Sequence, residues 1–244
     1  MENYNRNNRV KGIDQMRGLC IVYVMIYHLL FDIDEFLTPL AFFHTDWWEV
    51  IHIIVLAALF AVSGLSTSFS RDPLKAGVKL FFIGTAITML SDIFTQGEYT
   101  IRFGVLTFLG VSMMIYCFLK PITDKFSPLP YSVITAIIFI ILVSIFPIYI
   151  HSGITELYPL GIADSGFFSA DYFPLLPYFF IFLFGTAFIK PVRDRKIPDF
   201  WYTADIKPVN FIGRHSLIFY LAHQAVFVPI ILLIAYLITG RLPI

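Results

Sequence analysis

Charged residues are scarce in this sequence. Asp, Glu, Lys and Arg make up only 14% of its 244 residues, and the two signs cancel to a formal net charge of zero. Soluble domains average about 25% charged residues, so the composition argues against a soluble globular protein. The absence of a basic excess argues against nucleic acid as a partner. Cysteine is also rare, and Cys20 and Cys117 both lie in apolar stretches, which argues against a structural disulfide framework.

Long apolar runs dominate the chain instead. The sequence is 58% hydrophobic and contains 27 Phe. A helix that crosses a bilayer needs roughly 20 apolar residues. We therefore predict an all-α, polytopic membrane helical bundle with about seven transmembrane helices and a single transmembrane domain over residues 1–244. The polar first seventeen residues predict that no cleavable signal peptide is present. The runs fall near 17–37, 48–69, 74–94, 103–120, 130–150, 174–190 and 213–239.

The distribution of basic residues predicts the orientation. Cytoplasmic loops of membrane proteins carry an excess of Lys and Arg. With seven spans and a cytoplasmic N-terminus, all but two of the seventeen basic residues lie on the cytoplasmic side, and only Arg102 and Arg241 lie outside. We therefore expect the N-terminus in the cytoplasm.

Ionisable groups at membrane depth are the first functional candidates, because each is costly unless it faces a cavity or a partner. Asp14 and Arg17 can pair at the inner surface, since they are three residues apart on one helix. His28 follows about three turns later, near the middle of the membrane. Asp32 is on the same face as His28 and is suited to hold its imidazole in one tautomer. The alternative is that His28 is a hydrogen-bonding residue of helix packing.

The last apolar run carries a polar stripe. Arg214 and His215 lie at its cytoplasmic boundary, and a helix places the next polar residues on one face. Lipid contact does not produce such a stripe, so we expect it to face a polar cavity shared with His28. The stripe consists of Ser216, Tyr220, His223 and Gln224.

The outer side offers a further set of polar residues. His44 lies in the first outer loop, where Asp46 and Glu49 are close enough in sequence to tune it, and Trp47 is typical of a membrane interface. His52 begins the second apolar run. His44, Asp46 and His52 do not have the spacing of a recognised zinc site, and no metal is expected. Arg102 is interpreted either as a snorkelling interfacial arginine or as a donor fork for a carboxylate, sugar hydroxyl or phosphate.

Several motifs together resemble the heparan-alpha-glucosaminide N-acetyltransferase family and its short bacterial relatives. The resemblance covers nearly the whole chain. Residues 101–106 are similar to an Arg-Ile-Pro-Gly-Val-Leu stretch of the family, with Phe103 in place of Ile and one residue absent or shifted. The other motifs are Ile13 to Leu19 with His28 downstream, Phe43 to Trp47, Leu59 to Gly64, and Gly213 to Gln224.

The resemblance implies transfer of an acetyl group from cytoplasmic acetyl-CoA to a sugar on the far side of the membrane. His44 matches a first-loop histidine that is essential in the family. The spacing of Arg17 and His28 is similar to an arginine and histidine in the wider group of membrane acyltransferases that modify polysaccharides. The chain is much shorter than the eukaryotic enzyme, without its N-terminal lumenal part and with fewer helices. The resemblance therefore does not specify the acceptor.

The expected chemistry assigns three groups of residues. His28 or His44 acts as the base or carries the acetyl group transiently, with Asp32 beside His28. Arg102, Asp46, Trp47 and His52 are expected to bind the acceptor. The cytoplasmic basic groups would clamp the phosphates of the acyl-CoA donor, and the polar stripe would line the path of its pantetheine arm. This cofactor-binding group comprises Arg17, Arg71, Arg214, His215, Ser216, Tyr220, His223 and Gln224.

Two other functions stay open at this point. A transporter or channel would use His28, His223 and Asp32 as a polar pathway, although no inverted repeat is visible. A small membrane protein that acts as a partner or sensor without catalysis is the third. The expected partners are the lipid bilayer, acyl-CoA and an extracytoplasmic glycan or sugar acceptor, with a homodimer left open. The composition favours a bacterial plasma membrane.

Overall fold

The computed structural model describes residues 10–145, 150–151 and 155–241. In this part of the chain, seven helices are long and apolar enough to cross a membrane. The predicted helical membrane bundle is therefore confirmed. The spans are α1 (Lys11–Phe36), α2 (Asp46–Ser68), α3 (Pro73–Thr95), α4 (Val105–Thr123), α5 (Pro128–Ile145), α6 with α7 (Leu175–Arg193) and α10 (Ser216–Thr239).

The chain divides into two compact units. Residues 1–59 and 197–244 form the first unit, and residues 60–196 form the second. The division passes through α2, so its residues up to Leu59 belong to the first unit and those from Phe60 belong to the second. A single domain over the whole chain stays a prediction.

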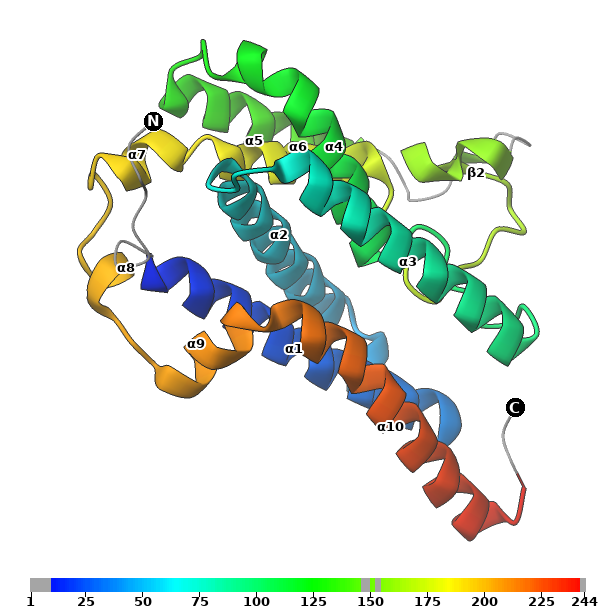
Figure 1. Cartoon of the computed structure of the whole chain (residues 1–244). Helices are drawn as coiled ribbons and strands as arrows, with labels where there is room; N and C mark the ends of the chain where they lie inside the picture. Colours follow the sequence, from blue (N-terminus) through cyan, green and yellow to red (C-terminus); the bar gives the residue numbers. More distant parts are fainter. Residues whose placement is uncertain (1–9, 146–149, 152–154, 242–244) are drawn as a thin grey trace. The chain divides into compact units, whose positions relative to one another are not determined.

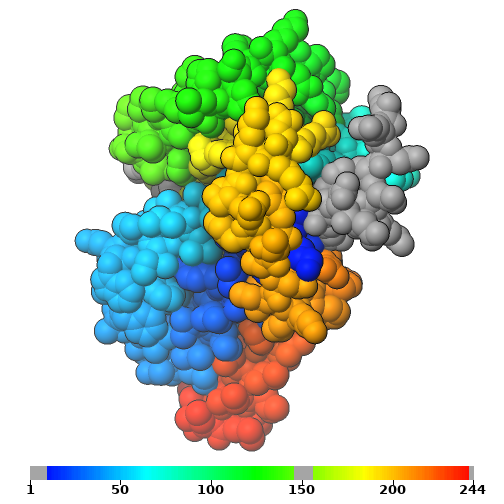
Figure 2. Space-filling view, turned by 90° about the vertical axis from the view of Figure 1, so that its left-hand side faces the viewer, coloured from blue at the N-terminus to red at the C-terminus, as the bar shows by residue number. Residues whose placement is uncertain are grey.

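In the first unit, other helices pack around α1. The short helices α8 (Phe200–Thr203) and α9 (Lys207–Arg214) contact α1, and so does α10. Figure 1 shows α9 and α10 running alongside α1. In Figure 2 the segment that contains α8 and α9, coloured orange, lies against the blue start of α1. The 3₁₀ helix η2 (Ala41–His44) contacts α1 as well.

Two helix boundaries in this unit differ from the apolar runs. α1 begins at Lys11 rather than near residue 17, because its first polar turn packs on α8 and α9. The run predicted at 213–239 is interrupted at His215, whose backbone angles are outside the helical range. His215 therefore separates α9 from α10. Hydropathy alone does not show either boundary.

In the second unit, α3 packs on α4 and α5 packs on α6 (Leu175–Thr186). The turn predicted at Arg71-Asp72-Pro73 caps α3, because the Asp72 side chain accepts a hydrogen bond from the backbone N–H of Lys75 at 2.9 Å. α5 ends at Ile145, and the rest of the run predicted to reach residue 150 includes residues 146–149, which lie outside the described part. Two short segments, β1 (Ile150–His151) and β2 (Ile162–Ala163), pair in parallel, and η3 (Thr155–Leu160) lies between them in sequence.

Aromatic rings fill the centre of the second unit. The rings of Phe60 and Phe108 are 4.5 Å apart, and Tyr178 lies against both of them. Close helix packing continues at Gly64, where an added Cβ would lie 2.0 Å from the carbonyl oxygen of Phe182. Small residues permit such close approach of membrane helices. Gly64 therefore has a packing role in this unit.

Candidate functional site

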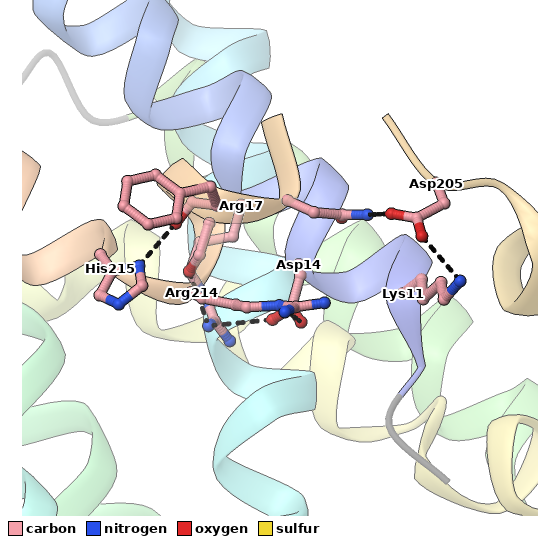
Figure 3. A network of polar contacts seen from close by, with 9 residues as sticks. Lys11, Asp14, Arg17, Asp205, Arg214 and His215 are labelled. Carbon is pink, nitrogen blue, oxygen red and sulfur yellow. Dashed lines mark hydrogen bonds and ion pairs between the residues drawn. The ribbon is translucent and has the colours of Figure 1, made fainter. Parts of the chain in front are cut away.

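A group of charged residues joins the first turns of α1 to the end of α9. The side chain of Asp14 is only 4% exposed, and its carboxyl lies between two arginines. Its Oδ1 is 3.8 Å from Nη1 of Arg17, and its Oδ2 is 3.7 Å from Nε of Arg214. Figure 3 shows both guanidinium groups directed towards this carboxylate. Asp14, Arg17 and Arg214 are called the charged cluster below. The predicted pairing of Asp14 with Arg17 is confirmed.

A second ion pair lies beside the charged cluster (Figure 3). Nζ of Lys11 is 2.8 Å from Oδ2 of Asp205, and Nδ2 of Asn210 donates to Oδ1 of the same carboxylate at 2.5 Å. These hydrogen bonds from Lys11 and Asn210 lower the pKa of Asp205. The contacts tie the segment before α9 to the start of α1.

Glycines allow α9 to approach α1 closely enough for these contacts. A Cβ added at Gly213 would lie 1.8 Å from the carbonyl oxygen of Asp14, and one added at Gly18 would lie 2.2 Å from that of Val209. Both distances are far below van der Waals contact. Arg17 also reaches across, with Nη1 donating to the carbonyl oxygen of Gly213 at 3.4 Å.

His215 follows the charged cluster but does not join it. Its Nδ1 is 2.9 Å from the carbonyl oxygen of Phe211, and its ring lies 4.5 Å from the Phe211 ring. The side chain is exposed. Ser216 begins α10 immediately afterwards. The assignment of both residues to a donor site stays a prediction.

A group of polar side chains, two of them buried and two half-buried, lies where α1 and α10 pack together. The rings of His28 and His223 are 5.0 Å apart, and Nε2 of Gln224 is 3.3 Å from Nδ1 of His28. Asp32, one helical turn further along α1, is 2% exposed. His28, Asp32, His223 and Gln224 are called the buried polar cluster. Gln224, rather than Asp32 as predicted, is hydrogen bonded to Nδ1 of His28.

The backbone of α10 fixes the hydrogen-bonding direction of His223. Its Nδ1 is 2.5 Å from the carbonyl oxygen of Tyr220. A carbonyl oxygen only accepts hydrogen bonds, so Nδ1 is the donor and the neutral ring has its lone pair on Nε2. Tyr220 therefore acts here through its main chain, while its ring is 5.5 Å from that of His223.

Aromatic rings extend from the buried polar cluster towards α2. The ring of His52 stacks on Tyr27 at 3.7 Å, and Tyr23 and Trp48 pack around the same pair. The hydroxyl of Tyr23, Nε1 of Trp48 and Nδ1 of His52 are buried, with no hydrogen-bond partner within the described residues. Buried polar atoms in native proteins are usually paired, so these atoms are suited to contact a polar ligand.

At the other end of α1, His44 pairs with Asp34. Nε2 of His44 is 3.0 Å from Oδ2 of Asp34 and 3.2 Å from Oδ1. Asp34 also accepts a hydrogen bond from the backbone N–H of Leu40 at 2.6 Å, which holds the start of η2 in place. The side chain of His44 is 66% exposed, so its imidazole is both oriented and accessible.

The other predicted acceptor-binding residues are spread over both units. Asp46 and Trp47 start α2, and the Trp47 side chain is exposed while its ring packs edge-on against Trp48. Arg102 is in the second unit, where Nη1 donates to the carbonyl oxygen of Phe168 at 3.2 Å. Arg71, which is predicted to bind the acyl-CoA donor, is also in the second unit, in the turn between α2 and α3. The binding roles of these four residues stay predictions.

Asp34 and Asp205 are absent from the residues selected by sequence. Asp34 lies ten residues from its partner His44, and Asp205 lies far along the chain from Lys11. The sequence places Asp34 near the outer end of the first run, but only the turn at η2 shows that it faces His44 in place of Asp46. For Asp205, no sequence spacing indicates the pairing.

The family model described as "Heparan-alpha-glucosaminide N-acetyltransferase, catalytic" matches residues 9–225. The matched range contains the charged cluster, the buried polar cluster and the His44–Asp34 pair. No curated protein and no solved structure matches the chain.

Proposed function

The chain belongs to the heparan-alpha-glucosaminide N-acetyltransferase family, and we propose that it transfers an acetyl group from cytoplasmic acyl-CoA to an extracytoplasmic sugar or glycan. The family is one of membrane acetyltransferases, and the seven apolar helices agree with an integral membrane protein. The identity of the donor, the class of acceptor, the direction of transfer and a bacterial plasma membrane as the location are parts of the proposal.

The arrangement of polar groups along α1 carries the proposal. The charged cluster lies at the N-terminal end of α1, the buried polar cluster lies further along it, and Asp34 with His44 lies near its C-terminal end. At 1.5 Å per residue, Asp14 and Asp34 are about 30 Å apart along the helix, which is about the thickness of the hydrocarbon core. One helix therefore presents cationic groups, buried hydrogen-bonding groups and an accessible histidine at successive depths.

The charge distribution supports the proposed direction. The basic residues predicted on the cytoplasmic side include Arg17 and Arg214, and cytoplasmic loops are enriched in such residues. Acyl-CoA is anionic at its nucleotide end, and arginine binds phosphate oxygens with a planar fork of donors. Among the described residues, Arg17 and Arg214 lie at this end of α1, and both are within 4 Å of the Asp14 carboxylate.

The His44–Asp34 pair supports a role for His44 as the base. The base takes the proton from the hydroxyl or amine of the acceptor, whose oxygen or nitrogen forms a bond to the thioester carbonyl carbon. The carbonyl electrons move to the oxygen, and when they return the carbon–sulfur bond breaks. The CoA thiolate leaves and takes up the proton. Asp34 orients the imidazole and stabilises its protonated form, as a carboxylate partner does for a catalytic histidine.

The proposal is tested with the purified protein in lipid nanodiscs and acetyl-labelled acetyl-CoA. We expect specific binding, slow hydrolysis of the thioester without an acceptor, and transfer of label when amino sugars or surface glycans are added. His44→Ala should abolish transfer and retain binding. Ser144→Ala, on the exposed face of α5, is the control.

Reconstituted vesicles test the direction. Transfer should require acetyl-CoA on the side of the charged cluster and acceptor on the side of His44. A protein that neither binds acetyl-CoA nor hydrolyses it would contradict the proposal, and proton-coupled uptake by the same vesicles would favour a transporter in its place.

A further inference from the structure

The amide of Gln224 contacts His28 within the buried polar cluster. Its Nε2 is 3.3 Å from Nδ1 of His28. Oε1 of Gln224 is buried and has no hydrogen-bond partner within the described residues. One end of this α10 amide is therefore paired with a histidine of α1, and the other end is not.

The two ends of this amide are not equivalent, because its NH₂ group only donates hydrogen bonds and its oxygen only accepts them. Rotating the amide by half a turn would place Oε1 against Nδ1 of His28 and would bury the NH₂ group in the position where Oε1 now has no partner. Two buried N–H donors without a partner cost more than one buried oxygen, so Nε2 of Gln224 is the atom that faces His28.

The direction of the amide determines the tautomer of His28. Nε2 of Gln224 is a donor, so Nδ1 of His28 must accept and have a lone pair. A neutral imidazole with a lone pair on Nδ1 has its hydrogen on Nε2. His28 is then a hydrogen-bond donor at Nε2, while its neighbour His223 is an acceptor at Nε2 because its Nδ1 donates to Tyr220. The two rings, 5.0 Å apart, have opposite hydrogen-bonding character.

We propose that Gln224 is a positioning residue that holds His28 as an Nε2–H donor to the carbonyl oxygen of the thioester. This inference rests on the proposed acetyl transfer, and it gives His28 the role of stabilising the negative oxygen rather than that of a base. The proton of the acceptor then goes to another group, such as His44. A donor that is already oriented in a buried site stabilises developing charge more strongly than one in water.

The tautomer is measured directly by nitrogen NMR on the full-length protein with isotopically labelled histidine, at about pH 8, where histidines with an ordinary pKa of about 6.5 are neutral. His28→Gln identifies the His28 signals by their loss. We expect a protonated Nε2 and an unprotonated Nδ1 for His28 in the wild type. A protonated Nδ1 would overturn the inference, and this readout does not depend on activity.

Variants of Gln224 test the positioning step. Gln224→Glu places an acceptor opposite Nδ1, so the His28 proton should move from Nε2 to Nδ1. Gln224→Met removes the contact and should produce a mixture of both tautomers. Gln96→Glu makes the same change at an exposed residue of the second unit and should leave the His28 signals unchanged. Unchanged signals in both Gln224 variants would overturn the inference.

Substitutions of His28 test its role in turnover. His28→Gln retains an N–H donor near the position of Nε2 but cannot act as a base, and His28→Leu retains neither function. We expect kcat to fall by about 10²- to 10³-fold in His28→Leu, the range found when an oxyanion donor is removed, and by no more than about tenfold in His28→Gln. Equal losses in both variants would overturn the donor role. If the wild type itself has no acetyl-CoA chemistry, the proposed function fails, and the NMR result still decides whether Gln224 sets the tautomer.

Discussion

Gly213 of α9 packs directly on the main chain of α1 at Asp14. The nearest atom to an added Cβ would be the carbonyl oxygen of Asp14, at 1.8 Å, and the backbone nitrogen of Gly18 would lie at 3.1 Å. Because backbone atoms cannot move as the end of a flexible side chain can, this contact has no room for a methyl group. The position of Arg214, the next residue, depends on it.

Gly213→Ala should therefore separate α9 from α1 and weaken the charged cluster. We expect a loss of about 1–3 kcal/mol in stability, as for other overpacked sites, measured as thermal unfolding of the purified protein. Gly166→Ala is the control, since an added Cβ there meets nothing within 4 Å. If the Gly213→Ala protein were as stable as the control, the separation of α9 from α1 would have no effect on stability, which would contradict the prediction.

Arg214→Gln should weaken donor binding through the phosphates alone. One charge-assisted hydrogen bond contributes about 1.5–3 kcal/mol, so Kd for acetyl-CoA should rise by roughly 10- to 100-fold. S-acetyl-pantetheine, which lacks the nucleotide and its phosphates, should bind the variant and the wild type equally. Isothermal titration with both ligands measures the difference, and equal losses for both would exclude a phosphate contact. Arg241→Gln, at the other end of α10, is the control.

Asp34→Asn should reduce transfer without preventing donor binding. The amide can still accept from the N–H of Leu40, but it no longer stabilises a protonated His44. We expect kcat to fall by about 10- to 100-fold, less than in His44→Ala, because general acid–base catalysis contributes about 10²–10⁴-fold in total. Glu49→Gln provides a control for the loss of a nearby acidic residue. Equal losses in the two variants would mean that the charge of the loop matters and the Asp34 contact does not.

The Lys11–Asp205 pair should make the thermal stability of the protein depend on pH. The pKa of Asp205 is lowered in the folded protein, so its contribution is fully present above the ordinary Asp pKa of about 3.9 and is lost as the pH falls through the lower folded value. At neutral pH, Asp205→Asn should unfold at a lower temperature than the wild type, and the difference should shrink below about pH 4. Asp199→Asn is the control, because the Asp199 side chain does not cap α8. Its difference in unfolding temperature from the wild type should not shrink with falling pH. A constant difference across this range would contradict the assignment.

The sequence was sufficient for the membrane class and the number of spans, because a bilayer requires long apolar runs and the chain has seven of them. It also predicted that the polar stripe on the last run faces His28, and two of its four residues, His223 and Gln224, contact His28; the shared polar cavity stays a prediction. The ends of α1 and the interruption at His215 were not predictable, because they depend on packing between segments almost 200 residues apart.

The partners of individual side chains were harder to predict than the helices. Asp32 was expected beside His28 because they are four residues apart, but the amide of Gln224 from another helix is the group hydrogen bonded to Nδ1 of His28. Asp46 was expected to tune His44, whereas the turn before η2 brings Asp34 to it. In both cases, spacing along one segment gave a plausible partner, and the path of the chain in space determined the actual one.

The charged cluster, the buried polar cluster and Asp34 all include residues of α1. The number of residues in this helix therefore sets the distances between them. One residue inserted between Arg17 and His28 would turn everything beyond it by about 100° and advance it by about 1.5 Å, so that His28 would no longer face α10. Four inserted residues would nearly restore the facing direction and would lengthen the separation by about 6 Å. For the proposed acetyl transfer, the number of residues in one helix would thereby set the length of acyl donor that spans the two clusters.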